Sequence, residues 1–340
     1  MTVDEKNMLK HMQEHIDIFM CPFCEGDVKI RGNIITCLNC KKQYPVESGI
    51  PLMFYQDESE EKPVTDRVKE FYEETPFPNY DGFENAGDLI QRANRSVFAR
   101  LLNEQTPFNI RVLEVGCGTG QLSNFLGIAH RHVFGVDMSL ASLALGQEFK
   151  NRNNLERVGF YQMNLYKPIF KDESFPLVFS NGVLPAVQDQ FGGFKSISRL
   201  VKKGGYIIIG LYNQFGRLLT DMRRLIFNAS GNRFLFLDPN LRSENMGDAK
   251  KRAWFMDQYK HPQELKNTMG EVLKWFKETG FEYIYGIPNP KAFEGLKSNE
   301  KLFAKHSPGS SLDHFLVQSY MIFTGSREGG FFIMIGRKMR

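Results

Sequence analysis

Residues 111–120, RVLEVGCGTG, are the part of this chain that decides its fold. A short apolar run leads through Glu114 into three glycines at alternate positions, Gly116, Gly118 and Gly120. Because glycine lacks Cβ, such a loop turns tightly and lets a ligand approach the backbone. A second apolar run ends in Asp137, which lies 17 positions beyond Gly120, where a ribose-binding carboxylate is expected. Together these features predict a strand and loop that bind a nucleoside cofactor.

The spacing of the glycines distinguishes between cofactor classes. A dinucleotide site has the pattern G-x-G-x-x-G, whereas here the pattern is E-x-G-x-G-x-G, with no cradle for a pyrophosphate. This stretch resembles the S-adenosylmethionine site of class I methyltransferases. The resemblance implies that the loop lies under the methionyl part, that Asp137 binds the ribose hydroxyls, and that Asn164 accepts from the adenine amino group. The cofactor-binding residues it implies are Glu114, Gly116, Cys117, Gly118, Gly120, Asp137, Met138, Asn164, Leu165 and Asn181.

Strands and helices alternate along the rest of the chain. Uninterrupted apolar runs predict strands at 158–162, 176–181, 206–210, 281–287 and 331–335, and helical spacing predicts helices at 139–149, 191–201 and 265–276. Lys203-Gly204-Gly205 is expected to stop the second of these helices. Unbroken apolar strands indicate a sheet covered on both faces. We therefore expect an α/β fold with a doubly wound, mostly parallel seven-stranded sheet, its terminal antiparallel hairpin implied by the family resemblance.

Two C-x-x-C knuckles lie near the N-terminus, formed by Cys21, Cys24, Cys37 and Cys40. Four thiolates at this spacing match a tetrahedral structural zinc site with no open position. Redox pairs or disulfides are the alternative reading, but nothing in the chain indicates secretion. Residues 18–54 also resemble the small zinc-ribbon proteins that activate tRNA and translation-factor methyltransferases. That resemblance implies a fused accessory ribbon and a possible protein partner.

These motifs divide the chain into two parts. Residues 1–62 are expected to form the zinc ribbon and an acidic linker, and residues 63–340 the methyltransferase-like domain, with lead-in helices at 65–108. The apolar spacing predicts that one of these helices runs from Leu89 to Leu101. No leader peptide or long apolar segment is visible, so we expect a cytoplasmic protein without a membrane span. In the lead-in region, Tyr72, Phe77 and Tyr80 are candidates for a lid over the cofactor. Packing onto the core is the alternative for each ring.

The net charge of the chain, +4, is concentrated in one predicted helical insertion after the fifth strand, at 213–261. This segment has nine Lys or Arg and five Asp or Glu, whereas the remainder has 34 of each. It follows a strand at the carboxyl edge of the sheet, where doubly wound folds bind ligands. We expect Arg217, Arg223 and Arg224 to bind an anionic acceptor, with a solvated helical face as the alternative.

Few residues in the sequence indicate a general base. Many relatives carry Leu-His-His after the fourth strand, but this chain has Leu184-Pro185-Ala186. The candidates that remain are Tyr212, Tyr259 and His261; His306 and His314 fall in an expected long loop. No Asn-Pro-Pro-Tyr run follows the fourth strand, which argues against the usual exocyclic-amine methylases of nucleic acids.

The resemblance implies an S-adenosylmethionine-dependent methyltransferase, and the basic insertion favours a small or carrier-bound anionic metabolite as acceptor. An RNA methyltransferase that uses the ribbon for recognition is a second hypothesis. RNA is less favoured because an excess of four charges and a pI of about 8.6 are low for a nucleic-acid-binding enzyme. A third hypothesis is a non-catalytic, cofactor-binding partner protein.

Overall fold

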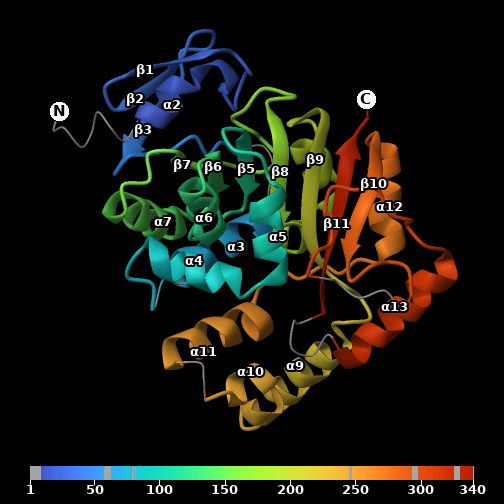
Figure 1. Cartoon of the computed structure of the whole chain (residues 1–340). Coiled ribbons are helices and arrows are strands. Elements are labelled where there is room, and N and C mark those ends of the chain that lie inside the picture. The colour runs from blue at the N-terminus through green and yellow to red at the C-terminus, as the bar shows by residue number, and fades with distance from the viewer. Residues whose placement is uncertain are drawn as a thin grey trace.

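The computed structural model describes residues 9–56, 63–78, 80, 82–244, 247–292, 298–324 and 330–339. Most of the acidic linker lies outside them. The main sheet has the order β10-β11-β9-β8-β5-β6-β7, as Figure 1 shows. Its strands are β5 (Arg111–Val115), β6 (His132–Asp137), β7 (Val158–Gln162), β8 (Phe175–Asn181), β9 (Val201–Tyr212), β10 (Phe281–Ile287) and β11 (Phe331–Lys338). Strands β5 to β9 are parallel and β11 is antiparallel to both neighbours, which confirms the predicted doubly wound α/β sheet.

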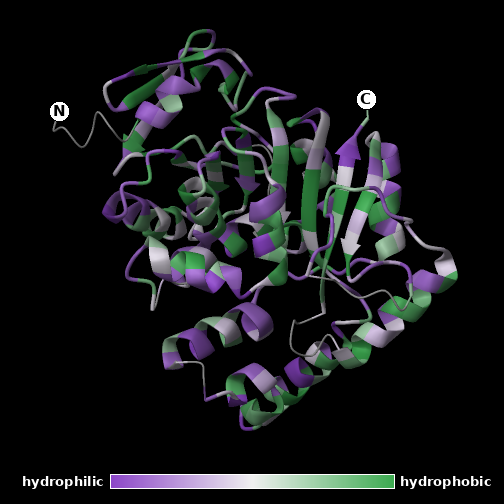
Figure 2. Ribbon diagram, in the orientation of Figure 1, coloured by the Kyte–Doolittle hydropathy of each residue, from purple (hydrophilic) through white to green (hydrophobic). Residues whose placement is uncertain are grey.

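Helices cover both faces of this sheet. The helices of the domain outside the insertion are α3 (Pro63–Glu74), α4 (Ala86–Asn94), α5 (Val97–Gln105), α6 (Gln121–Ile128), α7 (Leu140–Arg152), α8 (Gln190–Ser198), α12 (Met269–Glu278) and α13 (Ser311–Thr324). Alternate residues of β5 point to opposite faces. Val112 belongs to an apolar core with Phe125 of α6, while Leu113 belongs to a second core with Phe194 of α8. Figure 2 shows the hydrophobic residues concentrated in the central strands, as a doubly covered sheet requires.

The order of the strands creates a switch point beside β5. This strand pairs with β6 on one side and with β8 on the other. The chain runs outward from β5 to β7 and then returns past β5 to form β8 and β9. Loops that leave β5 and β8 therefore separate in opposite directions and open a crevice at the carboxyl edge of the sheet.

The N-terminal segment forms a small unit packed against the β6–β7 side of the domain (Figure 1). It contains α2 (Lys10–Glu14), the short helix η1 (Ile16–Ile18), β1 (Val28–Arg31), β2 (Ile34–Cys37), β3 (Gln43–Glu47) and β4 (Ile50–Pro51). Phe19 packs on Phe170 with ring centroids 4.9 Å apart, and Met20 N–H donates to Ile169 O at 2.8 Å. The connection from β7 to β8, residues 163–174, contains no helix although the structure describes all of it. The ribbon segment therefore covers a sheet face that lacks a crossover helix.

The predicted helical insertion follows β9. Its elements are α9 (Leu218–Ser230), η3 (Leu235–Leu237), α10 (Pro239–Arg242), α11 (Asp248–Phe255) and η4 (Met256–Lys260). Figure 1 shows α9, α10 and α11 grouped on the side of the domain opposite the ribbon. Among the helices that the structure describes, none combines the length and the apolar character needed to cross a bilayer.

Two secondary-structure predictions were wrong, one in the lead-in region and one near the C-terminus. The helix expected to run from Leu89 to Leu101 is interrupted, because Ser96 accepts the Ala99 N–H at its side chain and starts a new helix, α5. The long loop expected before the last strand contains α13 instead. Ser310 and Asp313 bond reciprocally at its first turn, which supplies a helix start.

Two element boundaries also differ from the prediction. Val201, assigned to the face of a helix, is the first residue of β9, so Lys203-Gly204-Gly205 lies within a strand and does not end the helix. Pairing of Val201 with Phe175 of β8 outweighs the local turn signal. Leu265 lies before α12, where its N–H donates to Pro185 O at 2.8 Å.

Candidate functional site

The loop after β5 has the backbone that its glycines predict. Gly116, Gly118 and Gly120 have φ values of 67°, 52° and 71°, in the left-handed region that side chains disfavour. Gly118 N–H donates to Asp137 Oδ2 at 2.8 Å, so the loop is fastened to the end of β6. A Cβ at Gly120 would lie 2.3 Å from the Phe160 ring. The glycines therefore allow both the turn and its close packing.

Asp137 is held in place by the backbone. Its Oδ1 accepts the Ser139 N–H at 2.9 Å, and its Oδ2 accepts from Gly118. Burial raises the pKa of the Asp137 carboxyl above its usual range, and these two N–H groups oppose the rise by favouring the charged form. Each oxygen retains a lone pair for a further hydrogen bond. The carboxylate is thus oriented before any ligand arrives.

Glu114 provides a second carboxyl group beside the loop. Burial raises its pKa to about 8, while the Ser123 hydroxyl, which donates to it, partly offsets this effect. The group is therefore mostly protonated at neutral pH. A cationic ligand beside it would favour the ionised form and release the proton.

These residues border a cavity of about 980 Å³. Nine of the ten residues expected to bind the cofactor line it: Glu114, Gly116, Cys117, Gly118, Asp137, Met138, Asn164, Leu165 and Asn181. Gly120 does not line the cavity. It lies two residues beyond Gly118 and is the N-cap residue of α6. The cavity continues past the loop to apolar residues at the ends of β10 and β11, among them Ile287 and Phe331. It is therefore longer than the predicted cofactor residues alone would require.

The surroundings of Asn164 and Cys117 limit what each side chain can do in the cavity. Asn164 Nδ2 donates to Tyr55 O at 2.9 Å, and Asn164 Oδ1 accepts the Tyr166 N–H at 3.0 Å. One lone pair of that amide oxygen is left for a ligand. Burial raises the pKa of the Cys117 thiol well above its usual range, so it stays protonated and is a poor nucleophile.

The lead-in segment lies over the glycine loop. The lid hypothesis therefore holds for part of this segment. A Cβ at Gly118 would lie 2.5 Å from Phe77 O, and the Thr119 hydroxyl donates to Pro78 O. Tyr72 and Phe77 line the cavity. Tyr80 does not; its ring stacks on the core instead, as the alternative reading has it.

Helix α3 connects this lid to α7 and to the insertion. The Glu73 carboxylate accepts the backbone N–H groups of Leu140 and Ala141 at 2.7 and 2.9 Å, which caps the N-terminus of α7. The neighbouring Tyr72 hydroxyl donates to Asp257 Oδ1 at 3.2 Å. The lid is therefore bonded on both sides of the cavity.

The structure separates the three residues expected to act in catalysis. Tyr212 lines the cavity, and its hydroxyl accepts from Gln258 Nε2 at 3.0 Å. Tyr259 is buried outside the cavity, and its hydroxyl donates to the Asp238 carboxylate. This hydrogen bond ties the insertion together and leaves Tyr259 away from the reacting space.

His261 also lies outside the cavity lining. Its ring packs against those of Phe71 and Tyr72, with centroids 5.2 and 5.5 Å apart, and its Nδ1 accepts the Gln263 N–H at 3.2 Å. Burial lowers the pKa of the imidazole, although the nearby Asp257 opposes that effect. Any influence of His261 on the cavity therefore passes through Tyr72 and Asp257.

The three arginines expected to bind the acceptor face other parts of the protein. Arg217 is fully buried, where its guanidinium donates to the Glu264 carboxylate and to Gln258 Oε1. Arg224 Nη2 donates to the same carboxylate at 2.8 Å, and Arg223 lies against the Tyr259 hydroxyl. None of the three lines the cavity. The expectation overlooked Glu264, which lies just beyond the insertion and neutralises part of its charge.

Sequence reasoning missed three charged residues of the cavity. Arg92 and Arg95, at the end of α4, both line it and are exposed. Within the described part of the chain, neither guanidinium has an ion-pair or hydrogen-bond partner. Asp257 lines the cavity as well, and burial raises the pKa of its carboxyl. The arginines could have been noted as cations within lead-in helices expected to lie over a cofactor.

The four cysteines of the knuckles come together as a set. Cys21 Sγ lies 3.7 Å from Cys40 Sγ, and Cys24 Sγ lies 3.5 Å from Cys37 Sγ. Sulfur atoms around a tetrahedral zinc with 2.3 Å bonds are about 3.8 Å apart, so this arrangement fits the ion. It does not fit disulfides, whose sulfurs are bonded at about 2.05 Å.

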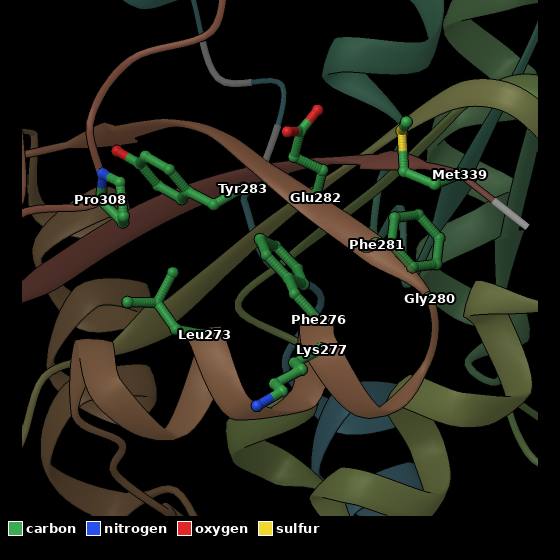
Figure 3. Close-up of a pocket in the computed structure, with 9 residues that line it drawn as sticks. All are labelled: Leu273, Phe276, Lys277, Gly280, Phe281, Glu282, Tyr283, Pro308 and Met339. Carbon is green, nitrogen blue, oxygen red and sulfur yellow. The ribbon is translucent and has the colours of Figure 1, made fainter.

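A second, shallower hollow of about 470 Å³ lies between α12 and β10. Figure 3 shows Leu273 and Phe276 of α12 on one side and Tyr283 of β10 on the other. None of the residues predicted for a site lines it. Its charged members are Lys277 and Glu282, and the Glu282 carboxylate is paired with Lys305. We assign no site to this hollow.

Comparison with known proteins agrees with this geometry. The family model described as "Methyltransferase domain" matches residues 108–280, from just before β5 to the end of α12. An uncharacterized protein of Synechococcus is 26% identical over 200 residues, which cover 51% of this chain and 48% of that protein.

The malonyl-[acyl-carrier protein] O-methyltransferase of Bacillus anthracis is 25% identical over 152 residues, which cover 43% of this chain and 54% of that enzyme. The chain thus spans about half the length of the curated relatives it matches. Among solved structures, a chain in the complex between the Haloferax volcanii Trm112 methyltransferase activator and a methyltransferase superposes with a TM-score of 0.45 at 12% identity. That match covers 75% of this chain and 95% of the other.

Proposed function

This chain belongs to the methyltransferase-domain family, and from that membership we propose that it is a cytoplasmic, S-adenosylmethionine-dependent methyltransferase whose acceptor is a small or carrier-bound molecule bearing negative charge. One observation carries the proposal. A single cavity joins the glycine loop and Asp137 to Arg92 and Arg95, two arginines without partners among the described residues. The glycine loop and Asp137 suit the cofactor, and the two arginines suit an anion.

The residues around the loop suit S-adenosylmethionine, which when bound supplies a methyl group already activated by its sulfonium. Asp137 and Asn164 both line the cavity; the first would accept from the ribose hydroxyls and the second from the adenine amino group. Glu114, near the end of β5, directly precedes the loop and lines the same cavity. Its protonation at neutral pH would give way to the charged form beside the ammonium of the ligand.

At the acceptor end, the residues mainly position the substrate. Methyl transfer to a correctly placed nucleophile gains most of its rate from proximity and orientation. Arg92 and Arg95 would hold a carboxylate or phosphate of the acceptor by charge-assisted hydrogen bonds. Where the acceptor must lose a proton, Asp257 is our candidate base, since it lines the cavity and its raised pKa is closer to neutral pH. Tyr212, the predicted candidate that also lines the cavity, would orient the acceptor beside it.

The ribbon completes the proposal as a built-in accessory unit that binds zinc through Cys21, Cys24, Cys37 and Cys40. Its exit from β4 reaches the cavity, because Phe54 lines it and Tyr55 O accepts from Asn164. The ribbon thus supports the cofactor site within the same chain. Its exposed Phe23 and Leu38 leave a surface for a protein partner as well.

A turnover screen tests the proposal and separates it from the two alternatives. The protein is incubated with S-adenosylmethionine labelled in its methyl group, against small-molecule extract and total RNA separately. We expect label in the small-molecule or carrier-bound fraction, with a shallow dependence on salt. Label in RNA, with affinity falling at a log–log slope of about −0.7 per phosphate contact, would establish the RNA hypothesis instead. Cofactor binding without turnover in either fraction would establish the non-catalytic partner.

A further inference from the structure

Three histidines meet where the N-terminal segment contacts the main sheet. His11 and His15 are one helical turn apart at α2, and His132 is the first residue of β6. Their ring centroids are 5.2 Å apart for the first pair and 4.7 Å for His15 and His132. One ring nitrogen from each lies within 4.8 Å of the other two. We call these residues the three-histidine cluster.

The hydrogen bonds of the cluster are incomplete. His15 Nε2 lies 3.1 Å from His132 Nδ1, and His11 Nδ1 lies 2.9 Å from the Tyr161 hydroxyl. His11 Nε2 and His15 Nδ1 are buried and have no partner among the described residues. A buried polar atom left unpaired costs about 1–3 kcal/mol. His11 is only 2% exposed, so solvent does not reach its free nitrogen.

The spacing of these nitrogens is that of metal ligands. Imidazole nitrogens 2.0–2.1 Å from a tetrahedral zinc ion are about 3.3 Å apart, close to the 3.1 Å between His15 and His132. Two histidines at i and i+4 of a helix are a recurrent ligand pair. Tyr161 holds the far nitrogen of His11, which is how partners outside a coordination shell orient a ligand.

The protonation states of the cluster also suit a metal. Burial lowers the pKa of His11 well below its usual range and that of His15 to about 4, and it lowers the pKa of His132 as well. All three imidazoles are therefore neutral at pH 7 and can bind a cation without first losing a proton.

The charges around the cluster restrict which cation could bind. Glu14 faces His132 and Asp17 faces His15, whereas Lys150, Arg111 and Arg157 are nearby cations. Arg111 is paired with Asp17 at 3.0 Å. Arg157 Nη1 donates to Asn109 Oδ1 at 2.6 Å and lies 3.3 Å from His132 Nε2, so it must turn toward Asn109 when His132 Nδ1 binds a metal. Two carboxylates against three cations give no net attraction for a cation, so the ion must bind imidazole strongly. This condition disfavours Ca²⁺ and Mg²⁺ and favours a divalent transition-metal ion.

We propose that the three-histidine cluster is a second metal site, which binds a divalent transition-metal ion, zinc foremost, through His11, His15 and His132. A water molecule would complete the tetrahedron. The site lies at the amino end of β6, whereas the cavity lies at the carboxyl edge of the sheet. Its role is to fasten α2, and with it the start of the ribbon, to the main sheet.

Metal counting tests this proposal in the full chain. Metal-depleted protein is titrated with Zn²⁺ and, in parallel, with Co²⁺, and bound metal per chain is measured after desalting. We expect His15→Gln and His132→Asn to bind one ion fewer than the wild type. His314→Asn changes a histidine outside the cluster and should bind as many ions as the wild type. In the Co²⁺ series, the cluster variants should keep the thiolate-to-cobalt absorption of the four cysteines.

Two further readouts keep the test decisive. Near-ultraviolet circular dichroism and cofactor affinity should be unchanged in the cluster variants, because the cavity is at the other edge of the sheet. Metal added beyond the one ion held by the four cysteines should raise the Tm of the wild type and of His314→Asn. It should not raise the Tm of the cluster variants. The proposal is overturned if folded cluster variants bind as many ions as the wild type, or if they lose the thiolate absorption together with the missing ion.

Discussion

The cofactor side and the acceptor side of the cavity are built in different ways. The cofactor side consists of short loops directly after β5 and β6, where the residues that act together, such as Gly118 and Asp137, are fastened by backbone hydrogen bonds. The acceptor side is assembled from α3 and α4 together with η4, which lies more than 150 residues further along the chain. A site made of loops beside paired strands can be recognised from a motif. A site made of helices that are distant in the sequence depends on which charged side chains are paired in the folded protein.

The largest expected effect on binding is on the cofactor side. Gly118→Val should weaken S-adenosylmethionine binding by at least about a hundredfold, since a side chain is strained at φ 52° and its Cβ would meet Phe77 O at 2.5 Å. Displacement of the lid thus adds to any clash with the cofactor. Calorimetry measures the affinity. Gly247→Ala, at a position with open space around it, should bind like the wild type.

Around Arg217, which lies outside the cavity lining, the strongest effect should be on stability. Glu264→Ala leaves the buried Arg217 without its carboxylate and should lower the free energy of unfolding by about 3–5 kcal/mol. Urea denaturation measures this change. Glu278→Ala removes an exposed ion pair with Lys274 and should cost no more than about 1 kcal/mol. Equal losses in the two variants would show that Arg217 is not a buried structural cation.

Asp137→Ala tests the ribose assignment. It should weaken S-adenosylmethionine binding by about 1.5–3 kcal/mol, the range for loss of a charge-assisted hydrogen bond. The measurement is calorimetric, and Asp172→Ala on the surface serves as the control. If Asp137→Ala binds like its parent, the carboxylate holds only the loop and not the cofactor.

The pH dependence of binding tests Glu114. Its carboxyl has a pKa of about 8 without ligand, so a cationic cofactor that favours the carboxylate must displace a proton at neutral pH. Affinity should therefore rise about tenfold from pH 7 to pH 9 and level off above the pKa. Glu114→Gln should remove this dependence. The sign for folding is opposite: a carboxyl whose pKa is raised in the folded state destabilises the fold as pH rises from about 4.5 to 8.

The smallest expected effect distinguishes the arginines of the two regions. Arg92→Ala and Arg95→Ala should each raise the acceptor KM about five- to tenfold, the loss of one exposed charge-assisted contact, without changing cofactor affinity. Arg223→Ala should leave both quantities unchanged. If Arg223→Ala raises the acceptor KM and the other two variants do not, the acceptor binds at the insertion instead.

Much of the main sheet could be predicted from the sequence. The bounds of β7 and β10 agree with those of the apolar runs at 158–162 and 281–287, because a buried strand needs a continuous apolar segment. The helix break at Ser96 was not predicted, since the apolar spacing continues across it and only the side-chain cap interrupts the helix. Strand β9 likewise extends through a local turn signal because its partner β8 is present.

The candidate site divides in the same way. Nine predicted cofactor residues line one cavity, whereas Tyr259, His261 and the insertion arginines do not. Net charge over residues 213–261 could not show that Glu264, three residues further on, pairs with Arg217 and Arg224. Counting charge along the chain treats each side chain as solvated. Burial makes the partner of each charge decisive.

The sequence by itself determined the glycine loop, the carboxylate after β6 and the set of four cysteines. Each depends on residues near one another in the chain, whose backbone conformation or spacing is the chemical requirement itself. Only the tertiary structure decided which arginines remain unpaired, that the ribbon covers the face beside β7, and that His132 joins His11 and His15. These outcomes depend on desolvation and on hydrogen bonds between residues more than a hundred positions apart, and such energies exist only once the sheet has assembled.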